Sequence, residues 1–209
     1  KAGYRTISIL QFALVAVLLL SLPLWKKAQS PTELAEESAT NPLKLRELFA
    51  LRGAKATFIA FFCYCSIETT VGLWGSTYLV LIRNVTTDTA AKWISLYYVG
   101  ITVGRLISGV LAAKLASSQM IRMGEAIIAI GVGILLSPLS GIFPLLGLFS
   151  IGLGCAPIFP TLLHETPNTF GKKNSQAVMG MQMATAYIGS TFMPPLFGFI
   201  GAKLNYGLL

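Results

Sequence analysis

The sequence predicts an all-α protein whose helices cross a membrane. Of its 209 residues, 54% are hydrophobic and only 11% are charged. Soluble domains carry about 25% charged residues, so this chain has too few polar groups to cover a surface that faces water. Its apolar runs are continuous and rich in Gly, Ala, Leu and Ile, whereas a membrane β-barrel needs short strands of alternating hydrophobicity. Both observations favour a polytopic bundle of transmembrane helices.

Six stretches qualify as candidate spans, because crossing about 30 Å of hydrocarbon takes roughly 20 residues of helix. The fourth is short, so we expect its first turn, near Arg122 and Glu125, to lie at the membrane interface. The six run over residues 4–25, 56–82, 93–115, 122–136, 143–163 and 177–202.

The longest polar stretch divides the chain into three parts. Residues 1–25 form a first span, residues 26–55 a loop, and residues 56–209 a bundle of five spans. Within the loop, residues 43–51 place Leu45, Leu48 and Phe49 among charged neighbours. This pattern predicts an amphipathic helix that lies along the membrane surface, and a tether without function is the alternative.

The basic residues indicate how the chain is oriented. Most of the 16 Lys and Arg residues fall on one side if loop 26–55 is cytoplasmic, and cytoplasmic loops are the ones enriched in these residues. We therefore expect a multi-pass protein of the plasma (cytoplasmic) membrane whose first span enters the cytoplasm. The net charge of +8 is spread over the loops, which argues against a nucleic-acid partner.

Enzymatic chemistry is not indicated. The short loops hold no nucleophile–base pair and no phosphate-binding loop. Cys63, Cys65 and Cys155 lie in apolar runs without a histidine or a second cysteine pair at metal-binding spacing. We expect free thiols, no metal site, no cofactor and no enzyme.

Glu68 is the strongest candidate for a functional residue, because it is the single acid in the apolar run 56–82. A charge at the centre of a membrane helix costs about 2.5–3.5 kcal/mol, and such residues usually serve binding or proton transfer. Tyr64 lies one turn earlier on the same helical face. Gly72 and Gly75 follow, and they predict a helix that unwinds easily near its middle. We expect Glu68 and Tyr64 at a central substrate or proton site.

Three further residues are candidates for the same site. Trp74 suits stacking on a sugar or a cation, or anchoring at the membrane interface. Gln182 needs a polar partner inside the membrane, which is either a ligand or another helix. Tyr97, in the third span, is the last candidate.

Two motifs identify a family. The third span ends in Gly100-Ile-Thr-Val-Gly104-Arg105-Leu-Ile-Ser-Gly109, and the fifth holds a Gly/Pro-rich run that ends in Glu165. Together they resemble the major facilitator superfamily of secondary transporters, as the second copy of its signature loop and as its tenth span. The resemblance covers essentially the whole chain, as the sixth to eleventh spans with the central loop. The family's acid before Gly-Arg is absent, since Val103 stands there.

The resemblance implies the incomplete C-terminal half of an alternating-access transporter, in which the missing N-terminal half completes the substrate site. It also implies a cytoplasmic gate in which Arg105 pairs with Glu165, beside the small residues Gly104 and Gly109. The alternatives are that Arg105 only reaches lipid phosphate, or that Glu125 is the acid involved. The Glu68-x5-Trp74 pattern is similar to the fucose-permease-like sugar branch.

The expected function is therefore secondary transport of a small solute, a sugar or related polar molecule, coupled to a proton or another ion. Two alternatives remain open. One is a proton-coupled exporter of drugs or apolar cations, for which an acid in the membrane is equally suited. The other is a receptor or scaffold that has the same fold but does not transport.

Overall fold

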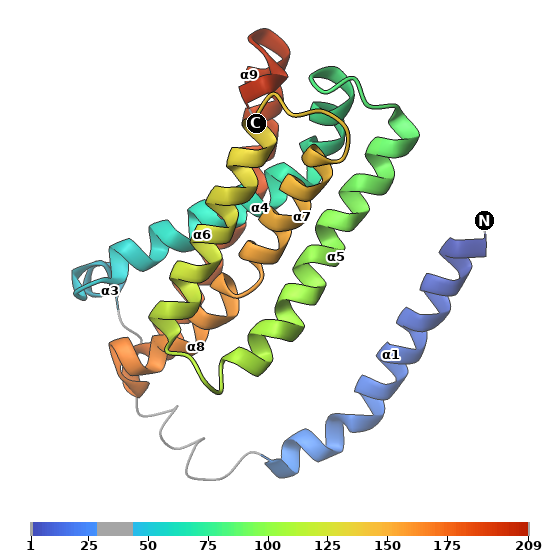
Figure 1. Cartoon of the computed structure of the whole chain (residues 1–209). Coiled ribbons are helices and arrows are strands. Elements are labelled where there is room, and N and C mark those ends of the chain that lie inside the picture. The colour runs from blue at the N-terminus through green and yellow to red at the C-terminus, as the bar shows by residue number, and fades with distance from the viewer. Residues whose placement is uncertain (1, 29–43, 209) are drawn as a thin grey trace. The chain divides into compact units, whose positions relative to one another are not determined.

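The computed structural model describes residues 2–28 and 44–208, which form helices and turns with no strand (Figure 1). The chain divides into two compact units, Lys1–Pro42 and Leu43–Leu209, and each is treated by itself. The first contains α1 (Ala2–Ala28), a single apolar helix with Pro23 inside it. The predicted all-α class is confirmed.

The second unit is a bundle of long helices. After the short α3 (Leu45–Ala50), the chain continues through six longer helices and ends in a 3-10 turn, Tyr206–Leu208. The helices are α4 (Ala54–Leu81), α5 (Thr87–Leu111), α6 (Ser117–Leu136), α7 (Phe143–Cys155), α8 (Ile158–Phe170) and α9 (Lys172–Lys203).

Five helical segments among the described residues are long and apolar enough to cross a membrane. They are α1, α4, α5, α6 and the α7–α8 pair taken together. The sixth predicted span, 177–202, forms one continuous helix within α9 but is not among these five. Gln182, Thr185, Thr191 and the Pro194-Pro195 pair dilute its apolar character.

α7 lies between α5 and α6 (Figure 1), and small residues allow these helices to approach it closely. A Cβ atom added at Gly104 would lie 2.8 Å from the carbonyl oxygen of Leu153, and one added at Gly124 would lie 2.6 Å from that of Gly154. These are backbone contacts, so no side chain larger than hydrogen fits at either position. Close backbone approach of this kind drives helix association in membranes, where apolar side chains gain little by leaving lipid.

The fifth predicted span is broken in the middle. α7 ends at Cys155, and α8 begins at Ile158 after Ala156 and Pro157. Pro157 and Pro160 lack a backbone N–H, so neither can donate to the carbonyl four residues earlier. The break turns the lower part of this span, α8, away from the axis of α7 (Figure 1).

α4 is the helix that carries most of the candidate site, and it packs mainly against α9. The expected unwinding at Gly72 and Gly75 is not observed, because α4 is helical throughout. The two glycines instead leave room for α5: the Tyr98 hydroxyl and the Ile94 side chain occupy the space that their Cβ atoms would take.

Candidate functional site

The centre of the site is an ion pair between two helices. Glu68 of α4 lies with its Oε1 atom 3.7 Å from Nη2 of Arg105, which comes from α5. The Glu68 side chain is 23% exposed and the Arg105 side chain 56% exposed. Each charge thus has the other as its counter-ion, which offsets part of the cost of placing it in a membrane-length helix.

Two tyrosines, Tyr64 and Tyr97, lie beside Glu68. Tyr97 is fully buried, and its hydroxyl donates to the backbone carbonyl of Glu68 at 3.1 Å. Tyr64 is also buried, but its hydroxyl has no hydrogen-bond partner among the described residues. Buried polar groups are almost always paired, so this hydroxyl, one turn from Glu68, is an exception.

A cavity of about 570 Å³ opens beside Arg105, toward the end of the bundle where α5 meets α6. We call it the Arg105 cavity. Its polar wall contains Ser108, Ser117, Thr161 and His164, and its apolar wall includes Phe159 and Pro160 beside the α7–α8 break. The break therefore shapes one side of the cavity.

The predicted pair of Arg105 with Glu165 is not formed in this structure. Arg105 instead pairs with Glu68, and Glu165 accepts a hydrogen bond from the Ser117 hydroxyl at 2.7 Å. Ser117 also lines the Arg105 cavity, so the residue that binds Glu165 and the other predicted gate residue, Arg105, border the same space.

The gate glycines have different surroundings. Gly104 packs directly against the backbone of α7, whereas an added Cβ at Gly109 would meet nothing within 4 Å. Gly109 instead lines the Arg105 cavity. Of these two glycines, therefore, only Gly104 makes a close contact with a neighbouring helix.

Comparison with known proteins decides the family. A family model described as Major Facilitator Superfamily matches residues 1–194, which is most of the chain. The chain belongs to the major facilitator superfamily. It is therefore a multi-pass membrane transporter for a small molecule, and the coarse prediction from the two motifs is confirmed. A comparison with curated proteins finds no match.

Trp74 lies away from the charge pair of this transporter and binds α9 instead. Its indole Nε1 donates to the carbonyl of Pro194 at 2.8 Å, and its ring stacks on Tyr206 with centroids 5.6 Å apart. Gly198 of α9 leaves the space that the indole ring fills. In this structure Trp74 thus packs α4 against α9, which is neither the ligand stacking nor the interfacial anchoring considered from the sequence.

Gln182 is the second candidate that has a helix as its partner. It is fully buried, and its amide nitrogen donates to the hydroxyl oxygen of Thr166 at 2.9 Å. The Thr166 hydroxyl in turn lies within donating distance of the Leu162 carbonyl and of the Gln182 amide oxygen, at 3.0 and 3.1 Å. Of the two alternatives for Gln182, this structure contains the helix–helix bond, between α8 and α9.

The sequence reading missed the cavity residues Ser117 and Thr161. Isolated hydroxyl residues in an apolar run carry little signal on their own. The contact of Tyr98 with Gly72 could not be predicted either, because it depends on how α4 and α5 are aligned along their length. Within residues 2–28 and 44–208, no three His, Cys, Asp or Glu side chains could hold a metal ion together.

Proposed function

We propose that this protein is a secondary active transporter that moves a small polar solute by alternating access, with Glu68 and Arg105 at its substrate and coupling site. The observation that carries the proposal is the ion pair between α4 and α5 at 3.7 Å. Ionisable side chains inside membrane bundles usually mark a substrate path or a proton relay. The unpaired Tyr64 hydroxyl adds an unused hydrogen-bonding group beside the pair.

The chemistry of the pair favours a solute rich in hydroxyl groups. A carboxylate accepts hydrogen bonds and a guanidinium donates up to five, so a sugar that carries adjacent hydroxyls could bind both groups at once. An apolar cation would have to compete with Arg105, which already neutralises Glu68. This supports a sugar or related solute over the alternative of a cation exporter.

Coupling follows from the same pair. A proton that binds Glu68 would remove the negative charge that attracts the Arg105 guanidinium of α5 to α4. Arg105 borders the cavity that Ser117 also lines, and Ser117 holds Glu165. In the opposite conformation of the transporter, the released guanidinium would then bind Glu165 and close the cytoplasmic end. Arg105 would thus alternate between two carboxylates, which is a bistable element of the kind that switching requires.

The chain would act as the C-terminal half of a transporter whose N-terminal half completes the site, so the test uses the full-length protein in vesicles. Uptake of tritiated monosaccharides is measured with and without an inward proton gradient, in the wild type and in Glu68→Gln. We expect the variant to lose at least tenfold in gradient-driven accumulation. Sugar exchange at equal pH on both sides should be retained, because it needs no net proton movement.

Other results would contradict the proposal. Unchanged gradient-driven uptake in Glu68→Gln would exclude Glu68 as the coupling residue. If a fluorescent lipophilic cation is transported and no sugar is, the protein is an exporter. Sugar binding without any exchange across the membrane would identify a receptor.

A further inference from the structure

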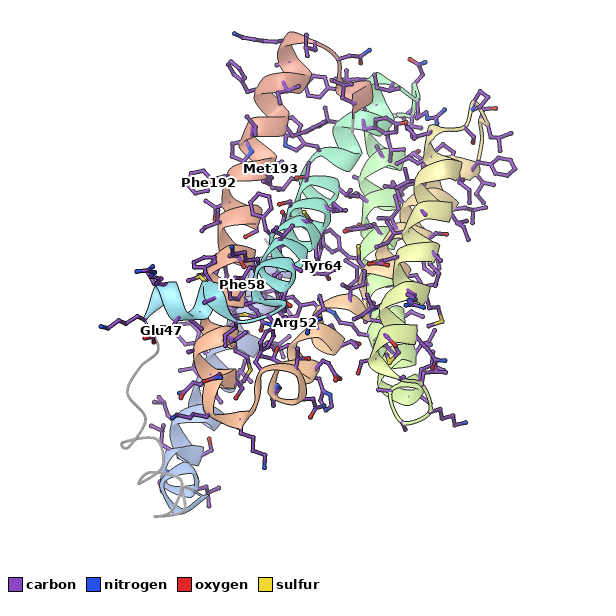
Figure 2. All side chains as sticks on the ribbon, turned by 90° about the vertical axis from the view of Figure 1, so that its left-hand side faces the viewer. Glu47, Arg52, Phe58, Tyr64, Phe192 and Met193 are labelled. Carbon is purple, nitrogen blue, oxygen red and sulfur yellow. The ribbon has the colours of Figure 1, made fainter. Side chains whose placement is uncertain are left out.

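The short helix α3 is fixed at the predicted cytoplasmic end of α4. Its Leu48 is buried in a cluster with Ala54 and Phe58 of α4 and with Phe170 and Val178 near the α8–α9 turn. The turn into α4 depends on Gly53, whose φ of 88° is rarely adopted by residues with a side chain. Figure 2 shows that α3 points to the side of the bundle instead of continuing α4.

An apolar groove lies where α3, α4 and α9 meet. We call it the α3 groove. Its volume is about 460 Å³, and its wall is formed mainly by aromatic and aliphatic side chains. The lining residues are Phe49 of α3, Lys55, Phe58, Ile59 and Phe62 of α4, and Thr185 of α9.

Lys55 lies at one end of the groove, where the apolar part of its side chain forms part of the wall. Lys55, Ile59 and Phe62 follow one another along one face of α4, at helical spacings of four and three residues. From Lys55 to Phe62 the helix rises by about 10 Å, at 1.5 Å per residue. Lys55 and Ile59 are both exposed. This face of α4 thus begins with a basic side chain beside the groove and continues with apolar ones along it.

The surroundings of the groove are strongly basic. Residues 44–55 contain Lys44, Arg46, Arg52 and Lys55, and Glu47 is the single acid among them. The Glu47 carboxylate accepts from the backbone N–H of Lys44 at 3.0 Å, so it is engaged in capping α3. Among the described residues, none of these four cations forms an ion pair. Figure 2 places Arg52 at the corner between α3 and α4.

We propose that the α3 groove binds an anionic phospholipid of the adjacent leaflet, with its phosphate at Lys55 and Arg52 and one acyl chain along Ile59 and Phe62. Charge complementarity selects this occupant: cations that form no ion pair with another described residue stand at the membrane-surface end, and an apolar slot leads away from them toward the membrane interior. Basic clusters beside membrane helices attract anionic lipids in this way. The lipid would fix α3, and with it the start of α4, at the membrane surface. The inference does not depend on the solute that the protein transports.

Lipid selectivity tests the charged end. The full-length protein in neutral detergent is titrated with phosphatidylglycerol and with phosphatidylcholine of the same acyl chains, and bound lipids are counted by native mass spectrometry. We expect Lys55→Gln and Arg52→Gln each to lower the preference for phosphatidylglycerol by about fivefold, the effect of one basic residue near a membrane surface. Lys114→Gln is the matched control, since Lys114 is also exposed but lies in the turn between α5 and α6. Equal loss in this control, or no preference in the wild type, would overturn the proposal.

Photo-crosslinking tests the apolar end and distinguishes a lipid from a protein segment. A photoreactive benzoylphenylalanine replaces Ile59, which is exposed at the groove, and the protein is irradiated in its native membrane. We expect the adduct to have the mass of a glycerophospholipid, and its yield to fall in Lys55→Gln. An adduct that contains a peptide, from this chain or from another protein, would show that the groove holds protein, and the proposal would be wrong.

Discussion

The guanidinium of Arg105 lies 3.7 Å from the carboxylate of Glu68, so the two charges that interrupt neighbouring membrane-length helices are each other's partner. Glu68 is the more buried of the two: its side chain is 23% exposed, whereas the longer Arg105 side chain is 56% exposed. Losing one partner should therefore cost more stability when Glu68 is the residue left alone than when Arg105 is. A free arginine can extend toward the membrane boundary, whereas a free carboxylate in the middle of α4 has no such route.

This asymmetry predicts different stabilities for three variants. Arg105→Gln leaves Glu68 without a counter-ion and should destabilise the protein by about 1–2 kcal/mol, less than the 3–5 kcal/mol of a fully buried pair. Glu68→Gln should cost less, because Arg105 can reorient. The double variant should recover most of the loss of Arg105→Gln. Thermal unfolding in detergent of the wild type and all three variants forms a double-mutant cycle that measures the coupling. Additive effects would show that the two side chains do not interact.

The partner of Arg105 illustrates where sequence reasoning ended. The family motif located Arg105 on the correct helix, but it suggested Glu165 as its partner. Helical side chains lean toward the N-terminus of their own helix. Since α5 runs antiparallel to α4, the Arg105 side chain leans from the end of the bundle toward the level of Glu68. Glu165 instead accepts a hydrogen bond from Ser117, and this hydroxyl has no signature in the sequence.

Hydropathy located the helices because burial in lipid requires long apolar runs, and so the all-α class was predictable. Polar residues within those runs were harder to assign. Gln182 needed a partner, but whether that partner is Thr166 or a solute depends on how α8 packs on α9. That packing depends on the break at Ala156-Pro157, which changes the direction of the fifth predicted span. Local sequence patterns contain no information on this angle.

The bond between Gln182 and Thr166 predicts an effect on stability and not on substrate affinity. Interhelical hydrogen bonds in membrane proteins contribute about 0.6 kcal/mol on average and up to about 1.7. Thr166→Val and Gln182→Leu should each lower the free energy of unfolding, and the double variant should lose less than the sum. Solute affinity, measured by exchange in vesicles, should stay within twofold of the wild type. A tenfold weaker affinity in Gln182→Leu with normal stability would place Gln182 in the substrate site after all.

The contacts of the Trp74 indole likewise predict an effect on stability without an effect on substrate affinity. Trp74→Phe keeps an aromatic ring but removes the N–H that donates to the Pro194 carbonyl, so stability should fall by about 1 kcal/mol. Tyr206→Leu is a useful companion, since it removes the stacked ring and keeps the hydrogen bond. Both variants should bind the solute normally in the exchange assay. Loss of sugar exchange in Trp74→Phe at unchanged thermal stability would restore the substrate-stacking role.

Two glycines on α6 give a matched test of the close packing around α7. A Cβ added at Gly131 would lie 2.8 Å from the Gly147 carbonyl oxygen, which belongs to the backbone, whereas one added at Gly133 would meet nothing within 4 Å. Gly131→Ala must therefore push α6 away from α7, at a cost of about 1–3 kcal/mol that is typical of overpacking. Gly133→Ala should be neutral or stabilise the protein by up to about 1 kcal/mol, because alanine restricts the unfolded chain at a helical position.

The measurement is thermal unfolding of the full-length protein in one detergent, with the yield of monodisperse protein as a second readout. Both substitutions add the same methyl group to the same helix, two positions apart, so differences in hydropathy and helix propensity cancel. The difference between the variants then reports the backbone contact alone. Equal midpoints for Gly131→Ala and Gly133→Ala would mean that α6 and α7 do not approach as closely as Gly131 and Gly147 require.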